Sequence, residues 1–342
     1  MRILNVKISF IVIAYNIENY IEKCLTSILG QTLKEIEVIV VNDGSTDGTL
    51  DKVKNISKAD DRVKILSQKN MGANAARKTG FFNATGEYVV FIDGDDWIDK
   101  ALAEDMYIFA GKENSDIVCY NYYIYYNENN IVKHIDNYYE NIKGDDFLNL
   151  ILEEKICHTL WNKFIKKEYL DSINFGELYD GSMGEDLAAN VLMAVYKPKV
   201  AMHEGIYYYY YQRNQSTMNK SSAKLLDIEG SLNCIENILR KQKIYNEFKE
   251  KVEFLWFIDC YLAMLLLTNL SIDEYHKKLF YIWKQKNIDI KKNDLCREYM
   301  KKVPVNKRLI SRVININYTL GVFFISVTRM LKSKKLRGAV YG

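Results

Sequence analysis

The chain has 342 residues, of which 48% are hydrophobic and 27% charged, so it can bury a large core and is not disordered. Its six cysteines are scattered without a C-x-x-C pair, which argues against a zinc or redox motif and is typical of reduced cytosolic thiols. The apolar run at residues 8–14 is short and lacks a small-residue cleavage site, so we interpret it as a first strand rather than a signal peptide. We expect a cytoplasmic protein of one large or two medium domains.

Strands alternate with helices over the first 120 residues. Apolar residues that run without alternation predict strands buried on both faces of a parallel sheet. Residues 20–29 carry apolar side chains at helical spacing, and Gly30 ends that helix. The alternation predicts a doubly wound α/β domain, which binds ligands where its strands end. The predicted strands are residues 8–13, 36–41, 63–66, 88–92 and 116–120.

The exit of the second strand, residues 42–49, is rich in Gly, Ser and Asp. Such a segment can bring backbone amides and one carboxylate close to a flat polar ligand. The carboxylate of Asp43 would suit the ring N–H of a uracil. The alternative is an ordinary loop in which Ser45 or Asp47 caps the next helix.

A helix is predicted to follow residues 68–72, after the third strand. Its small residues, Ala75, Ala76 and Gly80, permit close packing on the sheet. Arg77 places a planar positive group near the expected position of a diphosphate. The alternative is a surface arginine that pairs with an acid.

Three carboxylates, those of Asp93, Asp95 and Asp96, occur within four residues at the exit of the fourth strand. Like charges this close repel one another. A divalent cation shared with a diphosphate would compensate them, because Mg²⁺ typically takes one or two protein carboxylates and fills its shell with phosphate oxygens and water. Gly94 allows a tight turn. The alternative is that Asp95 or Asp96 caps a following helix.

The chain has neither a G-x-G-x-x-G segment nor a Walker A loop, so the dinucleotide dehydrogenase and P-loop NTPase interpretations lose their main support. Four segments, in their order and spacing, resemble the family 2 glycosyltransferases, which have the nucleotide-diphospho-sugar transferase (GT-A) fold. The match departs at Ala14, where the family usually has proline. The segments are IVIAYN (11–16), VNDGSTDGT (41–49), QKNMGANAARKTG (68–80) and FIDGDDW (91–97).

The resemblance implies that Asp43 holds the nucleobase, that Asp93 lies beside the ribose and the metal, and that Asp95 ligates Mn²⁺ or Mg²⁺. The donor would be a nucleotide sugar, with UDP favoured. A metal ion would neutralise the charge that grows on the departing nucleoside diphosphate. The other residues expected at the donor are Ala14, Tyr15, Asn16, Asn70, Gly72, Arg77 and Gly94.

The acceptor half of the fold is expected in residues 121–216, where the composition shifts to Tyr and Asn. Residues 161–165 are similar to the W-N-K segment of bacterial family members, so Trp161 could stack on a sugar ring. A core tryptophan is an equal alternative. Arg213 is expected to reach the diphosphate or an acceptor phosphate. Further predicted elements are helices at 144–152 and 187–195 and strands at 199–203 and 206–211.

A second acidic pair, Glu185 and Asp186, precedes the helix at 187–195. Carboxylates at a helix start can simply cap it. In the functional interpretation, an inverting transfer needs a base opposite the leaving group to take the proton of the acceptor hydroxyl. The family resemblance places that base in this pair, with Asp186 as the first candidate and Glu185 as the second.

Helical periodicity dominates from about Ser222 onward. We therefore expect a GT-A domain at 1–216, with a nucleotide-sugar half at 1–120, followed by a C-terminal helical region at 217–342. After Pro304, apolar residues from Leu309 to Leu331 recur at steps of three or four and form one apolar face.

The final segment, residues 299–342, has ten Lys or Arg and no acid. Because the net charge of the whole chain is +3, the other 298 residues carry a net charge of 3 − 10 = −7. Its least polar part, 313–328, is shorter than the roughly 20 apolar residues of a spanning helix. The pattern favours interfacial binding to anionic lipid. The alternative is a helix packed on its own domain or on a dimer partner. Nothing favours nucleic acid, because no binding motif is present.

Together these features predict a metal-dependent inverting glycosyltransferase, peripheral on the inner face of the plasma membrane. It would move a sugar from a nucleotide diphosphate to a hydroxyl of a growing, lipid-linked cell-surface glycan. The alternative is a non-catalytic nucleotide-sugar or glycan-binding subunit of a polysaccharide assembly complex. The sugar, the linkage and the oligomeric state are left open.

Overall fold

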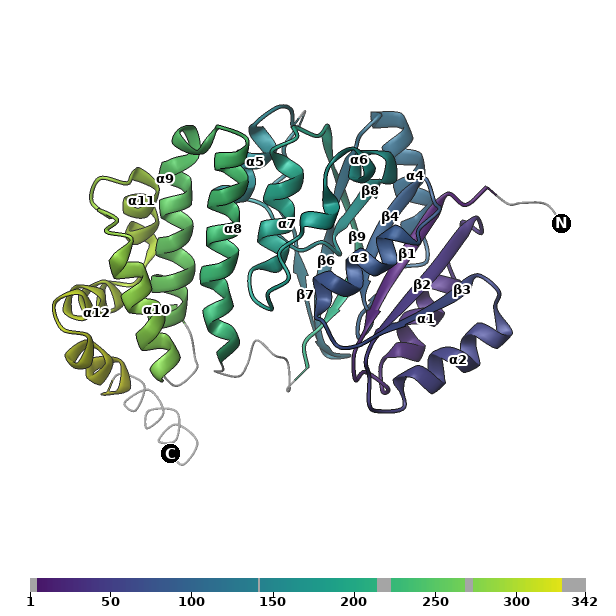
Figure 1. Ribbon diagram of the computed structural model, residues 1–342, viewed down its shortest axis with the longest axis horizontal. Helices are drawn as coiled ribbons and strands as arrows, with labels where there is room; N and C mark the ends of the chain where they lie inside the picture. The colour runs from purple at the N-terminus through teal and green to yellow at the C-terminus, as the bar shows by residue number, and fades with distance from the viewer. Residues whose placement is uncertain (1–4, 141, 214–222, 268–272, 328–342) are drawn as a thin grey trace.

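In the part of the chain that the computed structural model describes, residues 5–140, 142–213, 223–267 and 273–327, nine strands form one sheet. Helices cover both faces of this sheet, and further helices extend the molecule at one end (Figure 1). The strands are β1 (Ile8–Ala14), β2 (Ile36–Asp43), β3 (Val63–Gln68), β4 (Tyr88–Asp93), β5 (Trp97–Ile98), β6 (Ile117–Asn127), β7 (Asn130–His134), β8 (Lys163–Lys166) and β9 (Val200–Tyr211).

The helices fall into two groups. Seven α-helices precede Arg213 among the described residues, and the remaining ones form the C-terminal helical region. They are α1 (Ile21–Leu29), α2 (Thr49–Ala59), α3 (Ala73–Phe82), α4 (Leu102–Glu113), α5 (Asp146–Leu152), α6 (Lys167–Ser172), α7 (Glu185–Ala194), α8 (Asp227–Lys241), α9 (Tyr245–Leu255), the π-helical segment η4 (Trp256–Leu267), α10 (Glu274–Gln285), α11 (Asp294–Lys302) and α12 (Val305–Ile316).

The four N-terminal strands confirm the prediction of a parallel sheet, and β1, β2 and β4 are buried as predicted. The prediction of burial is wrong for β3, which lies at the edge of the sheet and buries only Val63 fully. The four strands run in the order β3-β2-β1-β4, and each neighbouring pair is parallel. Successive side chains of β1 point to opposite faces of the sheet, as in any strand, and so they pack in two different apolar cores. Phe10 and Val12 pack in the core that contains α1 and α4, and Ile11 packs in the core that contains α3. Because these strands are parallel, their exits meet at one edge of the sheet.

Helix α3 lies close to the sheet, as its small residues predict. A Cβ on Gly80 would lie only 2.3 Å from Cγ2 of Ile11, so only glycine fits this contact. Helix α2, which the sequence analysis did not place, follows Gly48. Each of the six cysteines is a free thiol, as expected.

The second half of the sheet is mixed. Strand β8 lies antiparallel between β4 and β6, β9 runs parallel to β6, and β5 pairs antiparallel with β9. Residues 199–203 and 206–211 were predicted as two strands, but they form the single strand β9. Its register with β6 shifts where Glu204 and Gly205 are accommodated as a bulge, which explains the interrupted pattern in the sequence.

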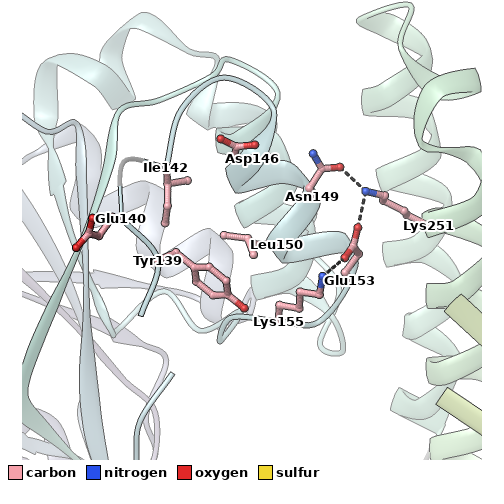
Figure 2. Close-up of a pocket in the computed structure, with 9 residues that line it drawn as sticks. All are labelled: Tyr139, Glu140, Ile142, Asp146, Asn149, Leu150, Glu153, Lys155 and Lys251. Atoms are coloured by element: carbon pink, nitrogen blue, oxygen red, sulfur yellow. Dashed lines mark hydrogen bonds and ion pairs between the residues drawn. The ribbon is translucent and has the colours of Figure 1, made fainter. Parts of the chain in front are cut away.

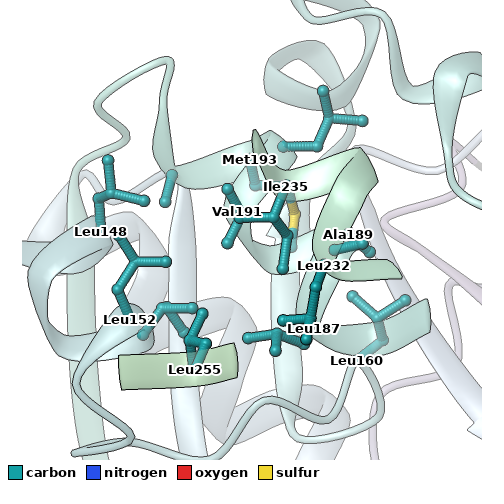
Figure 3. Close-up of a cluster of buried hydrophobic side chains, with 14 of the residues drawn as sticks. Leu148, Leu152, Leu160, Leu187, Ala189, Val191, Met193, Leu232, Ile235 and Leu255 are labelled. Atoms are coloured by element: carbon teal, nitrogen blue, oxygen red, sulfur yellow. The ribbon is translucent and has the colours of Figure 1, made fainter. Parts of the chain in front are cut away.

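The helical region continues the core of the sheet domain. Leu152 of α5, Leu187 of α7, Leu232 of α8 and Leu255 of α9 belong to one buried apolar cluster, shown in Figure 3. The predicted boundary at residue 216 lies outside the described residues, so the division into 1–216 and 217–342 stays a prediction. The cluster itself extends across that boundary.

The last helices differ from the single apolar helix that the sequence predicts after Pro304. Helix α12 ends at Ile316 with Asn317 as its C-cap, and residues 318–327 form a further helix. The predicted start near Ser222 and the end at Leu331 lie outside the described residues. Among the helices of the described ranges, none has the length and apolarity to cross a bilayer.

Candidate active site

Three strand exits form the edge at which the predicted donor residues lie. Strand β1 lies between β2 and β4, and its residue Ile13 is in register with Asp93 of β4. Asp43 is the last residue of β2, and Ala14 is the last residue of β1. The exit of β1 therefore lies between the carboxylates of Asp43 and Asp93, as the sequence pattern predicts for a doubly wound sheet.

The exit of β1 is attached to the exit of β2 by the side chain of Asn16. Asn16 has φ 51°, a left-handed conformation that asparagine tolerates better than most residues. Its Oδ1 accepts a hydrogen bond from the backbone N–H of Thr46 at 2.8 Å, and its own N–H donates to Oγ of Ser45 at 3.1 Å. Tyr15 is exposed beside this junction. The two loops therefore form one preformed wall of the site.

Asp43 is buried and organises the loop that follows β3. Its Oδ1 accepts from Nε2 of Gln68 at 2.8 Å and from the N–H of Met71 at 2.9 Å, and its Oδ2 accepts from the N–H of Gly72 at 2.9 Å. Gly72 has φ +93°, which favours glycine. A carboxylate has about four acceptor positions. Three are used here, and Asn70 lies exposed in the loop that they hold.

Arg77 joins the two acidic segments. Its Nη2 lies 3.3 Å from Oδ1 of Asp93, and its Nη1 lies 2.8 Å from Oδ1 of Asp186 and 2.9 Å from Oδ1 of Asn74. Only 3% of its surface is exposed, so it is a buried arginine rather than the surface arginine of the alternative. The exit of β4 and the start of α7 are thus held together by one guanidinium.

Asp95 and Asp96 have separate partners. A guanidinium nitrogen of Arg213 lies 2.6 Å from Oδ2 of Asp95. Asp96 accepts a hydrogen bond from Oη of Tyr208 at 2.7 Å and from the N–H of Tyr211 at 2.7 Å, so it anchors the turn to β9. Strand β5 follows the turn, so the alternative in which Asp95 or Asp96 caps a following helix is wrong.

Gly94 is required for space in this turn. Its backbone N–H donates to the carbonyl oxygen of Ile13 at 3.0 Å, and a Cβ would lie 2.5 Å from Cδ1 of Ile17 and 2.8 Å from that same oxygen. Its φ is not left-handed. The sequence analysis predicted a tight turn here, and the close approach of β1 and its exit is the physical reason.

The positive charges near the turn do not fully balance its three carboxylates, whose pKa values are all raised. Burial raises the pKa of Asp93 to about 6; the nearby charges of Asp95 and Asp186 add to that rise, and Arg77 opposes it. Burial also raises the pKa of Asp95, against the opposing charge of Arg213. The pKa of Asp96 lies well above its usual value because of burial and its two acidic neighbours. A divalent cation would stabilise the ionised forms.

Asp93 and Asp95 fit a cation that takes part of its shell from a ligand. Nowhere in the described ranges do three or more His, Cys, Asp or Glu side chains converge on one point. A cation that uses one or two protein carboxylates together with diphosphate oxygens and water needs no larger cluster. The two carboxylates are hard oxygen donors, as Mn²⁺ or Mg²⁺ requires.

The acidic pair of α7 lies at the first turn of that helix. Gly184 precedes it with φ +70°, and its carbonyl oxygen accepts a hydrogen bond of 2.6 Å from Oγ of Ser231 on α8. Burial and the charge of Asp186 raise the pKa of Glu185 to about 7, against the opposing charge of Arg77. Oδ2 of Asp186 accepts only a long contact of 3.3 Å from the N–H of Leu160.

Trp161 packs as a core tryptophan. Only 3% of its surface is exposed, and its ring stacks on Tyr208 with centroids 4.3 Å apart. The sequence analysis missed the neighbouring Lys163, which is fully buried. Its Nζ donates to the carbonyl oxygens of Cys157 at 3.0 Å and Thr159 at 2.6 Å, and so shapes the loop that reaches Asp186.

A cavity of about 350 Å³ lies elsewhere, beside α5 and α9 (Figure 2). Glu153 sits between Lys155 and Lys251 on its wall, with a separation of 2.5 Å in each ion pair. None of the predicted site residues lines it. The cavity is therefore separate from the edge where the strand exits meet.

Comparison with known proteins identifies the class. The model of the family described as "Glycosyl transferase family 2" matches residues 9–173. The chain is 30% identical over 230 residues to the glycosyltransferase GlyG of Streptococcus pneumoniae, covering 62% of this chain and 72% of that protein. The chain therefore belongs to glycosyl transferase family 2, and it is a glycosyltransferase.

Longer matches support the same class and the fold. The cholesterol galactosyltransferase of Borreliella burgdorferi is 28% identical over 346 residues, covering 93% of this chain and 95% of that protein. The crystal structure of TarS 1–349 of S. aureus in complex with UDP-GlcNAc superimposes with a TM-score of 0.54 at 19% identity, covering 82% of this chain and 92% of that chain. The GT-A fold expected from the sequence is confirmed.

Proposed function

We propose that the chain is a metal-dependent inverting glycosyltransferase that uses a nucleotide diphosphate sugar, with UDP favoured. The observation that carries this proposal is the bridge from Asp93 through Arg77 to Asp186. This bridge joins the turn that is proposed to hold the cation to the first turn of α7, which is proposed to hold the catalytic base. Such a site has the two parts that an inverting transfer needs, one for the leaving group and one for the acceptor proton.

The donor is proposed to bind across the exits of β1, β2 and β3. Asp43 has one acceptor position left after its three hydrogen bonds, which suits the single ring N–H of a uracil. Ala14, Tyr15 and Asn16 would form one side of this part, and the loop with Asn70 and Gly72 the other. The UDP-GlcNAc bound to TarS, a protein of the same fold, supports the choice of UDP.

The diphosphate is proposed to lie over the turn that contains Gly94, where Asp93 and Asp95 would hold Mn²⁺ or Mg²⁺. When bound, the cation supplies the positive charge that stabilises the departing nucleoside diphosphate. Arg213, which pairs with Asp95, is close enough to this turn to move from the carboxylate to a phosphate oxygen. Its planar guanidinium suits either partner.

The acceptor hydroxyl is proposed to lose its proton to Asp186. The acceptor oxygen attacks the anomeric carbon opposite the nucleotide, the bond from that carbon to the diphosphate oxygen breaks, and its electron pair leaves with the nucleoside diphosphate. The proton goes to Oδ2 of Asp186, because Oδ1 is the oxygen bound by Arg77. Glu185 is the second candidate, since a pKa near 7 suits a general base.

The acceptor is proposed to be a lipid-linked glycan at the inner face of the plasma membrane. An acceptor of this kind would bring the basic segment 299–342 close to anionic lipid, and the cholesterol galactosyltransferase among the relatives is named for a lipid acceptor. Trp161 is buried, so we do not assign it to the sugar.

The experiment that tests the proposal measures free nucleoside diphosphate released from a panel of nucleotide sugars, each with Mn²⁺, Mg²⁺ or EDTA. Metal-dependent release from one donor supports the enzyme and identifies the sugar. Asp186→Asn should lose transfer while it still binds the donor, and Asp51→Asn, an exposed acid on α2, should keep both. No release from any donor, even with a membrane extract as acceptor source, would favour a non-catalytic binding subunit.

A further inference from the structure

Large apolar side chains are exposed on the last two described helices. On α12 and on the helix at 318–327 they form a surface that we call the outer apolar face. Ile316 is 88% exposed and Phe323 is 61% exposed. The face consists of Val305, Leu309, Ile316, Leu320, Phe323 and Phe324.

The opposite sides of the same helices account for their attachment to the protein. Ile310, Ile314 and Ile325 are buried in the main apolar cluster. Gly321 lies directly against Ile314, because a Cβ on Gly321 would be 2.1 Å from Cγ1 of Ile314. The two helices therefore already have a packed inner side, and the outer apolar face is not needed to hold them in place.

Asn317 creates the geometry of this surface. It ends α12, and its Oδ1 accepts a hydrogen bond of 3.0 Å from the N–H of Leu320 in the next helix. The chain thus forms two short helices in contact, where the sequence predicts one long helix. Both lie at the opposite end of the long axis from β2 and β3 (Figure 1).

Positive charge accompanies the outer apolar face. Lys301 and Lys302 are exposed just before α12, Arg312 is exposed on α12, and Arg308 is partly exposed there. The sequence has no acidic residue after Glu298. Lys301 is paired with Glu298, whereas no ion pair of Lys302, Arg308 or Arg312 is found among the described residues. Exposed apolar side chains next to such basic residues are the composition of helices that lie in the interface of an anionic bilayer.

We propose that the outer apolar face docks on the surface of an anionic lipid bilayer, with its Leu, Ile and Phe side chains among the acyl chains and Arg308 and Arg312 at the lipid phosphates. The two helices lie along the membrane surface and do not cross it. A second copy of the chain would bury the apolar side chains equally well, but it would bring the basic residues of both copies together. The charge therefore selects lipid over self-association.

Flotation of the full chain with vesicles tests this proposal. We expect at least tenfold more protein with phosphatidylcholine vesicles that contain phosphatidylglycerol than with phosphatidylcholine alone. Phe323→Ser/Phe324→Ser should reduce binding at least tenfold. Arg308→Glu/Arg312→Glu should remove the preference for the anionic vesicles. A matched control is Phe82→Ser/Ile108→Ser, which removes two exposed apolar side chains from α3 and α4 and should bind as the unmodified chain does.

Two further measurements keep the outcome unambiguous. The thermal unfolding midpoint of each variant should match that of the unmodified chain, because the side chains changed are exposed or partly exposed. Molar mass in solution should be that of a monomer. Equal binding to neutral and anionic vesicles, no binding to either, or a dimer that Phe323→Ser/Phe324→Ser dissociates would each overturn the proposal. None of these readouts depends on the transfer reaction.

Discussion

The guanidinium of Arg213 lies 2.6 Å from Oδ2 of Asp95, although the two residues belong to the exits of different strands, β9 and β4. Asp95 is also a residue that we propose to bind a divalent cation. Arg213 therefore provides a positive charge at the position where a cation would act, and the two compete for the same carboxylate.

This competition predicts that Arg213→Ala raises the affinity of the nucleotide-free protein for Mn²⁺. We expect the dissociation constant to fall about tenfold, equivalent to about 1.4 kcal/mol, because a neighbouring positive charge is removed. Titration followed by electron paramagnetic resonance of free Mn²⁺ measures it. Arg62→Ala removes an arginine that pairs with Asp60 instead, and it should leave the affinity unchanged. Unchanged or weaker Mn²⁺ binding by Arg213→Ala would contradict the assignment of Asp95.

Arg77→Met should strongly destabilise the fold. It leaves the partly buried carboxylates of Asp93 and Asp186 without their counter-charge, and removal of one partner from a buried ion pair costs about 3–5 kcal/mol. Urea denaturation measures the free energy of unfolding. Arg77→Lys should recover only part of it, because one ammonium cannot replace a planar group that reaches two carboxylates. In Lys54→Met, which removes an exposed ion pair with Asp51, we expect a change of less than about 0.5 kcal/mol.

The raised pKa of Glu185 predicts a pH dependence of stability. Its pKa is about 7 in the folded chain, while an unfolded glutamate titrates near 4.3. Between these values the folded state holds a proton that the unfolded state has released. The contribution of Glu185 to the free energy of unfolding is therefore greatest at low pH, and it is lost as the pH rises through 7. Glu185→Gln should remove this dependence.

The measurement is the difference in free energy of unfolding between Glu185→Gln and the unmodified chain at pH 5 and at pH 8. From pH 5 to pH 8, the free energy of unfolding of the variant should rise by about 2 kcal/mol relative to that of the unmodified chain. Titration of Asp93 occurs in both proteins and largely cancels. Glu104→Gln, on the exposed side of α4, should show no such change. A pH-independent difference for Glu185→Gln would contradict the raised pKa.

Two glycines give opposite predictions for the same substitution. Gly80→Ala should destabilise the chain by about 2 kcal/mol, because the new Cβ would lie 2.3 Å from Cγ2 of Ile11 in the core. Gly111→Ala in α4 has no atom within 4 Å of the new Cβ, so it should stabilise by about 0.5–1 kcal/mol. Thermal unfolding of both variants checks the pair. Equal effects of the two would rule out close packing as the reason for Gly80.

The sequence was sufficient to locate the strand exits but not their side-chain partners. Asp43 and Asp93 follow runs of buried residues, a local pattern that a single sequence displays. The pairing of Asp96 with Tyr208 depends on β5 lying beside β9, which joins segments more than one hundred residues apart. No local pattern contains that contact. The role of Lys163 was missed for the same reason, because the residue type alone does not indicate whether a lysine is buried or exposed.

The last helices show a different limit. Apolar residues after Pro304 keep a helical spacing across Asn317, so periodicity alone predicts one continuous face. The close contact of Gly321 with Ile314 favours two helices, and this contact is a property of the folded chain. Strand β9 is the reverse case, because a bulge at Glu204 and Gly205 interrupts the pattern while the strand continues.

The apolar cluster that runs from α5 and α7 into α8 and α9 makes the helical region a structural support of the chemistry. Deleting the chain from α8 onward would uncover Leu187 and would remove Ser231, whose hydroxyl holds the carbonyl oxygen just before the proposed base. We therefore expect amide hydrogens of α7 and α8 to exchange with solvent as one cooperative unit. Attempts to trim the enzyme to a minimal catalytic fragment should keep α8.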